Sequence, residues 1–185
     1  MKFISVSTIA WLLLCASSYA QENIAGGVVY GDKGAFNISP PDGWVLDVKA
    51  GVEQGLPCVL YPKGSSWSGA DTVMYANVAG EEFTDAAAFA ARAIQEMKKK
   101  HGIPKEKIAS GKTKGGEAYF INEYPATATY SQWEQVAYIQ LPGAVGYVVL
   151  SSRNEKSYRK DKHALEDVLK TVFYVGKVEL KRDNS

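Results

Sequence analysis

The stretch F-N-I-S-P-P-D-G-W, residues 36–44, closes one predicted strand and opens the next. Phe36 and Ile38 alternate with polar residues, which is typical of a strand with one buried face. Two prolines end this strand, because proline fixes φ and cannot donate to a β-ladder. Proline at the second position and glycine at the fourth predict a type I turn over residues 40–43. Trp44 then follows as a large structural anchor of the next strand.

Short strands separated by turn signals continue on both sides of this corner. They are rich in β-branched and aromatic residues, and glycine or proline bounds them. In the first half of the chain we expect strands at 28–30, 35–39, 44–48, 58–61 and 72–78. In the second half we expect strands at 107–113, 117–124, 133–141 and 145–152. The breaks between them are short, so successive strands should pair antiparallel.

Two segments have the periodicity of amphipathic helices. The first covers residues 85–100, and Thr84 is the residue expected to cap it. One side of this helix carries an apolar stripe made of Phe89, Ala90, Ala93, Ile94 and Met97. The second helix covers residues 155–173 and follows Asn154, another good cap. The pattern predicts an α+β fold in which helices flank an antiparallel β-sheet.

Residues 1–20 have the features of a signal peptide. A basic Lys2, a short apolar core and the small residues Ser18 and Ala20 predict cleavage before Gln21. The apolar core is shorter than the roughly 20 residues needed to span a bilayer, and the rest of the chain offers no transmembrane segment. We therefore expect the mature protein to be soluble and exported to the periplasm or secreted.

Cys15 allows a rival interpretation, a lipoprotein anchored through that cysteine. The residue before a lipidated cysteine is normally small, whereas Leu14 is large. This context favours cleavage before Gln21 over lipidation.

The rest of the chain predicts one domain without a charge signature. We expect a flexible leader at 21–27, a single domain at 28–175 and a polar tail at 176–185. Lys2 is the only charged residue of the signal peptide, so the 21 basic residues of the chain become 20, against 20 acidic ones. Nucleic-acid binders usually show a basic excess, so we expect no nucleic-acid partner.

Candidate catalytic groups are scarce. Cys58 lies in the apolar run L-P-C-V-L-Y, which predicts a buried thiol. His101 follows three lysines at a helix end and His163 lies among charges, so we expect both at the surface. No metal-binding, phosphate-binding or nucleophile motif is present. We therefore predict no catalytic residue, no cofactor-binding residue and no metal site.

The corner F-x-I-x-x-P-x-G-W resembles the start of the PsbP-like superfamily, which includes bacterial DcrB-type periplasmic proteins. The alanine-rich helix at 84–100, the segment G-G-E-A-Y-F-I-N-E-Y at 115–124 and the final helix running into V-F-Y are similar to elements of the same superfamily. The resemblance covers about residues 28–175. It implies an α/β/α sandwich around an antiparallel sheet, and proteins that act mostly through noncatalytic binding and assembly.

This resemblance and the export signal predict a noncatalytic binding or assembly factor that contacts another envelope protein in the periplasm. Trp67, in the serine- and glycine-rich loop K-G-S-S-W-S-G-A-D, either covers the core or contacts that partner. Tyr130 and Trp133 extend this candidate partner-binding patch if their loop is a neighbour. Two alternatives remain open: a small-ligand or metal carrier with a cleft beside the sheet, and an enzyme with a site of dispersed polar residues.

Overall fold

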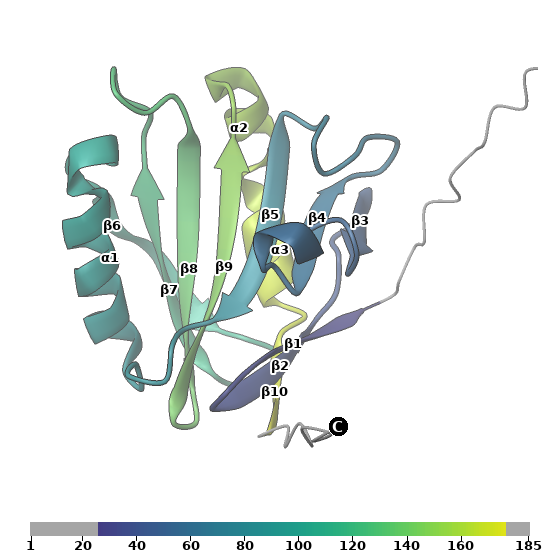
Figure 1. The fold of residues 1–185 in the computed structure, drawn as a ribbon, viewed down its shortest axis with the longest axis vertical. Coiled ribbons are helices and arrows are strands. Elements are labelled where there is room, and N and C mark those ends of the chain that lie inside the picture. The colour runs from purple at the N-terminus through teal and green to yellow at the C-terminus, as the bar shows by residue number, and fades with distance from the viewer. Residues whose placement is uncertain (1–25, 177–185) are drawn as a thin grey trace, which may run out of the picture.

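A computed structural model describes residues 26–176 of the chain (Figure 1). The expected signal peptide, Cys15 and most of the expected polar tail lie outside these residues. The first half contains the strands β1 (Gly27–Gly31), β2 (Gly34–Ile38), β3 (Trp44–Asp47), β4 (Cys58–Pro62) and β5 (Thr72–Val78), with a short 3-10 helix η1 (Val52–Gln54). The second half contains α1 (Ala86–His101), β6 (Lys105–Lys112), β7 (Ala118–Tyr124), β8 (Trp133–Leu141), β9 (Ala144–Ser152), α2 (Glu155–Asp161), α3 (His163–Leu169) and β10 (Phe173–Gly176).

Seven strands form the main sheet, in the order β3-β4-β5-β9-β8-β7-β6. Every neighbouring pair in it is antiparallel, as the short breaks predict. A second sheet has the order β1-β2-β10. The expected helix over 155–173 is therefore wrong at its end: the chain leaves the helix after Leu169, and Phe173 pairs with Asn37 of β2. The aromatic and β-branched residues of F-Y-V suit a strand better than a last helical turn.

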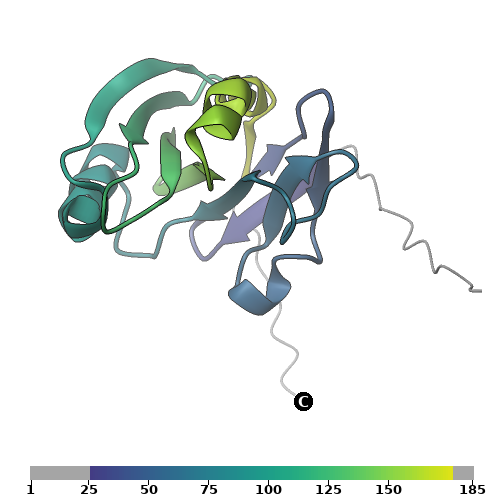
Figure 2. The ribbon, with the colours of Figure 1, turned by 90° about the horizontal axis from the view of Figure 1, so that it is seen from above.

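The main sheet carries helices on both faces (Figures 1 and 2). On one face, Ala86 and Ala90 of α1 are buried against the β8 residues Val136 and Tyr138. On the other face, α2 and α3 contribute the buried residues Tyr158, Ala164, Leu165, Val168 and Leu169 to the larger core. The predicted α+β class with an antiparallel sheet and flanking helices is confirmed.

The layer that contains α1 covers only part of its face. Beside β3 and β4 the buried cluster consists of Val45, Val59, Tyr61 and Ala70, and loop residues, among them Trp67, pack against it. The complete three-layer sandwich expected from the sequence is therefore only partly formed. One face of the sheet has a border where helical cover gives way to loops.

The corner at residues 40–43 is present, but its turn lies one residue later than predicted. The amide of Trp44 donates to the carbonyl of Pro41 over 3.0 Å. Gly43 is thus the third turn residue, with φ of 79°, which a type II turn requires and glycine adopts without strain. Trp44 is partly buried and packs against the main core, in agreement with its expected role as an anchor.

The helix ends follow the sequence signals with one correction. Asp85, not Thr84, caps α1, and its carboxylate accepts from the amide of Ala88 over 2.7 Å. Asn154 caps α2 as predicted. No helix within residues 26–176 has the length and apolarity needed to cross a membrane.

Candidate functional site

A cleft of about 450 Å³ opens on the α1 side of the main sheet, where loops replace helical cover. Its floor contains Val73 of β5, Ser151 of β9 and Glu134 of β8, which are aligned in register across the three central strands. Tyr75 lies two residues further along β5, so its side chain points to the same face. The walls come from two loops, one carrying Trp67 and the other carrying Tyr130.

The Trp67 loop joins β4 to β5, and Arg153 attaches it to the end of β9. One guanidinium nitrogen of Arg153 donates to the carbonyl of Ser68 over 2.8 Å. The backbone amide of Arg153 donates to the carbonyl of Asp71, also over 2.8 Å. Trp67 is half-buried and packs against the cluster around Val45. It therefore covers the core and lines the cleft at the same time.

The Tyr130 loop joins β7 to β8 and is held by the end of α1. The hydroxyl of Thr127 donates to the carbonyl of Lys100, one of the last carbonyls of α1, which have no partner within the helix. The Thr127 and Tyr130 backbones form an isolated antiparallel bridge. These contacts place the Tyr130 ring over His101, with ring centroids 4.1 Å apart.

Glu134 is the acidic group of the cleft floor, and only 6% of it is exposed. Its contacts are long: the hydroxyl of Tyr130 donates over 3.5 Å, and Nε2 of His101 lies 3.5 Å away. Burial raises the pKa of Glu134, against weaker opposing effects of Ser151, Tyr130 and Lys100. The site thus contains a buried carboxyl group that has no lysine or arginine partner among residues 26–176.

His101 lies directly behind this carboxyl group. The residue is 1% exposed, and neither ring nitrogen makes a hydrogen bond. Burial, and to a smaller extent repulsion by Lys100, lowers the pKa of His101 to about 4. The ring is therefore neutral near pH 7 and packs between Tyr124 and Tyr130.

An apolar cavity of about 150 Å³ adjoins the cleft beneath α1. Phe89, Ala93 and Met97 of α1 form its roof. The cavity and the cleft share Tyr75 and Glu134 as lining residues. A bound group in the cleft would thus have apolar space next to it.

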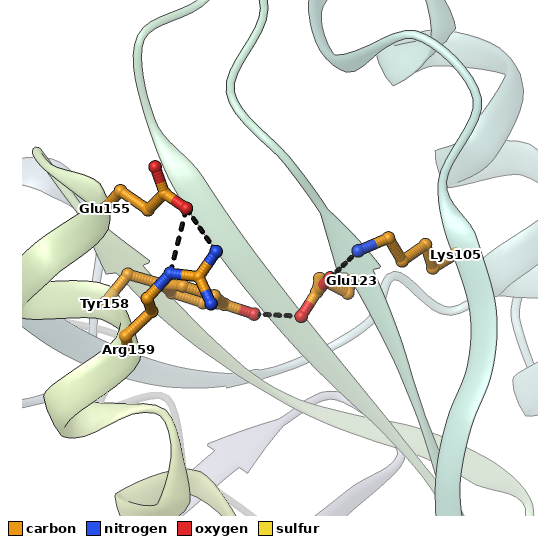
Figure 3. A network of polar contacts seen from close by, with 5 residues as sticks. All are labelled: Lys105, Glu123, Glu155, Tyr158 and Arg159. Carbon is orange, nitrogen blue, oxygen red and sulfur yellow. Dashed lines mark hydrogen bonds and ion pairs between the residues drawn. The ribbon is translucent and has the colours of Figure 1, made fainter.

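The other face of the sheet contains a second buried glutamate, Glu123, which unlike Glu134 has close hydrogen-bonding partners (Figure 3). Glu123 accepts from the Tyr158 hydroxyl over 2.5 Å and pairs with Lys105 over 2.7 Å. Burial acts to raise the pKa of Glu123, but the hydrogen bonds from Lys105 and Tyr158 outweigh it and the pKa is lowered. Beside it on α2, Glu155 and Arg159 form an exposed pair one helical turn apart. These contacts attach α2 to β7, so we regard this cluster as structural.

Comparisons with known proteins find similarity among solved structures, and that similarity concerns the fold. No protein-family model matches the sequence, and no curated protein sequence matches it either. Among solved structures, LpqN of Mycobacterium tuberculosis superposes with a TM-score of 0.55 at 16% identity, covering 81% of this chain and 90% of LpqN. The cyanobacterial PsbP protein (CyanoP) of Synechocystis gives a TM-score of 0.49 at 14% identity, covering 86% of this chain and 99% of CyanoP. The superposition with LpqN shows a PsbP-like fold. The resemblance stated from the sequence is confirmed at the level of fold.

The PsbP-like fold brings two of the three predicted partner-binding residues together. Trp67 and Tyr130 line the same cleft although 63 positions separate them in sequence. Trp133 lies elsewhere: its ring stacks on Tyr158 of α2, with centroids 5.5 Å apart, on the opposite face of the sheet. Successive side chains of a strand point to opposite faces. Glu134 therefore faces the cleft, whereas Trp133, which we had expected to extend the patch, faces away from it.

Of the other residues considered from the sequence, two lie where we expected and one does not. Cys58 is buried as expected, and burial raises the pKa of its thiol to about 12. His163 is exposed as expected. The expectation of a surface position for His101 is wrong, because the Tyr130 loop covers the end of α1. The sequence did contain a signal: His101 is four positions beyond Met97 and thus continues the apolar stripe of the helix.

Three groups of the cleft were missed by sequence reasoning: Glu134, Tyr75 and Arg153. The alternation Glu134, Val136, Tyr138 marks Glu134 as facing the α1 side, and that signal was available. Within residues 26–176, no three His, Cys, Asp or Glu side chains lie close enough together to hold a metal ion.

Proposed function

We propose that this protein is an exported, noncatalytic binding or assembly factor that holds a segment of another envelope protein in the cleft between Trp67 and Tyr130. The observation that carries this proposal is the cleft itself, in which two loops and three strands place aromatic rings around a polar floor. Tryptophan and tyrosine are enriched among residues that dominate protein–protein binding energy. A cleft of about 450 Å³ has room for one or two side chains of a partner.

Export is supported by the sequence of residues 1–20. LpqN, which has a similar fold, is described as involved in cell envelope biogenesis of Mycobacterium tuberculosis. A binding role in the envelope is consistent with both observations.

A noncatalytic role is supported by the position of the reactive groups. His101 is enclosed and does not line the cleft, so it cannot exchange a proton with a substrate there. Cys58 is fully buried with a raised thiol pKa, which disfavours the nucleophilic thiolate. An enzyme would need to work with the other polar groups of the cleft, such as Glu134, Arg153 and the tyrosines.

One observation favours a second candidate function, a carrier of a small molecule. The apolar cavity beneath α1 adjoins the cleft and would accept an apolar group of such a ligand. A carrier would retain a small molecule through purification, and mass spectrometry of the denatured native protein would detect it.

Photo-crosslinking in the native envelope tests the binding proposal. Ser68 is exposed and lines the cleft, so a photoreactive phenylalanine there should crosslink to the partner. Lys156 on α2 is also exposed, on the other side of the sheet, and serves as the control position. The proposal expects a discrete protein adduct at position 68, lost in the Trp67→Ala background and absent at position 156. Equal labelling at the two positions would contradict it.

A further inference from the structure

We infer that the cleft accepts a cationic side chain, lysine or arginine, of the bound partner, with its charged group against Glu134 and its stem between the aromatic rings. This inference rests on the proposed function, because it specifies what the bound segment must carry.

The first argument is that Glu134 lacks a cation. Its side chain is 8% exposed and faces the cleft. Among residues 26–176 no lysine or arginine nitrogen lies within 4.0 Å of its carboxylate, and the nearby His101 ring has both nitrogens without hydrogen bonds. A buried carboxylate without a cationic partner is costly, and a cation from a ligand would remove that cost.

Glu123 shows how the same fold stabilises a buried glutamate that needs no ligand. Lys105 lies 2.7 Å from it and the Tyr158 hydroxyl donates over 2.5 Å (Figure 3). Within the part of the chain that the structure describes, Glu134 has no such cation, and the Tyr130 hydroxyl and the neutral His101 ring lie 3.5 Å from its carboxyl oxygens. The two residues are similarly buried and differ in their partners, so Glu134 is the one that is open to a further donor.

The second argument is the aromatic wall. Tyr75, Tyr130 and Trp67 line the cleft around Glu134. Aromatic faces attract ammonium and guanidinium groups, and the attraction grows when water is excluded. Tyr130 already attracts Lys100 of the protein itself, whose Nζ atom lies 5.9 Å from the ring centroid. The long apolar stem of lysine or arginine would pack along the same rings.

The cation present in the cleft, Arg153, does not neutralise this acid. Its guanidinium donates to the carbonyl of Ser68 and holds the Trp67 loop. Arg153 is exposed, whereas Glu134 forms the buried floor. An anionic ligand would have to approach the carboxylate of Glu134, which disfavours anions at the floor.

Peptide titration followed by NMR chemical shifts or by tryptophan fluorescence tests the inference. The probes are blocked tripeptides, acetyl-Gly-Lys-Gly-amide and acetyl-Gly-Arg-Gly-amide, with norleucine and glutamate peptides as matched controls. We expect the cationic peptides to bind at the cleft at least tenfold more tightly than the norleucine peptide. Glu134→Gln preserves shape and should weaken their binding at least tenfold, about 1.4 kcal/mol. Glu96→Gln, at an exposed position of α1, should have no effect.

The outcomes separate this inference from the proposed function. Equal binding of the lysine and norleucine peptides, or unchanged binding by a folded Glu134→Gln variant, would overturn the inference. If the partner still crosslinks at position 68 in that case, the proposed function stands although the inference about a cationic side chain fails. If neither the crosslink nor any peptide binding at the cleft is found, both fail. Melting curves of Glu134→Gln show whether a loss of binding has another cause, namely misfolding.

Discussion

The Nε2 atom of His101 lies 3.5 Å from Oε2 of Glu134, with both side chains buried behind the Tyr130 ring. The two atoms are as close as in an ion pair. The His101 ring is nevertheless neutral, because burial lowers its pKa to about 4. A partly desolvated carboxyl group next to an uncharged ring is an unfavourable arrangement for stability alone. We interpret it as a binding feature, since binding sites often retain groups that the fold itself does not satisfy.

His101 should make the protein less stable in acid. Its pKa is about 4 in the folded protein and about 6.5 in the unfolded chain, so the unfolded state binds more protons between these values. Stability is then highest above pH 6.5 and falls toward pH 4, by at most about 1.4 kcal/mol per pH unit. In His101→Phe this dependence should be absent. Urea unfolding of both proteins from pH 4 to pH 8 measures the difference, and identical pH profiles would show that His101 does not contribute.

Glu134 and Glu123 should respond in opposite directions to the same change. The raised pKa of Glu134 means that its ionised form is unfavourable in the fold, so Glu134→Gln should increase the unfolding free energy above pH 7. This gain should vanish below about pH 4, where both states of the wild type are protonated. Glu123→Gln should instead destabilise by roughly 1–3 kcal/mol, because it weakens the contacts with Lys105 and Tyr158.

Chemical denaturation at pH 7.5 compares these two variants with the wild type. A loss of stability in Glu134→Gln similar to that in Glu123→Gln would mean that Glu134 has partners that stabilise it. That result would contradict the description of Glu134 as a carboxyl group open to a ligand.

Trp44 should contribute to stability and not to binding. It is partly buried, packs against the main core and follows the turn at Gly43. Truncation of a large core aromatic residue costs about 3–5 kcal/mol, and partial exposure reduces this to roughly 2–3 kcal/mol for Trp44→Ala. Urea denaturation measures the loss. A value below about 1 kcal/mol, typical of surface substitutions, would mean that Trp44 is not an anchor.

The fold could be predicted from local patterns to a large extent. Strand alternation, short breaks and the stripe of α1 indicated an antiparallel sheet with helices, and Asn154 marked the start of α2. The end of the chain was harder: Phe173 belongs to a strand because β2 offers it a free edge, which depends on tertiary contacts. The turn at Gly43 lies one residue later than predicted, because glycine tolerates the positive φ at the third turn position.

The candidate site was less predictable, because it depends on which loops meet. Trp67 was recognisable as a large aromatic residue in a polar loop, but its proximity to Tyr130 follows from the order of the strands in the sheet. Trp133 and Glu134 are adjacent in sequence and lie on opposite faces. His101 was misplaced because three lysines precede it, and the spacing from Met97 was the better signal.

The most direct test of the central claim is the affinity of Trp67→Ala for the protein that crosslinks at position 68. Trp67 is half-buried and packs against a small cluster beside β3 and β4, so the variant should keep most of its stability and melt within about 5 °C of the wild type. Lys156→Ala, on the far side of the sheet, is the matched control and should bind normally. We predict at least a tenfold rise in Kd for Trp67→Ala, about 1.4 kcal/mol. An unchanged Kd in a folded Trp67→Ala protein would contradict the assignment of this cleft as the binding site.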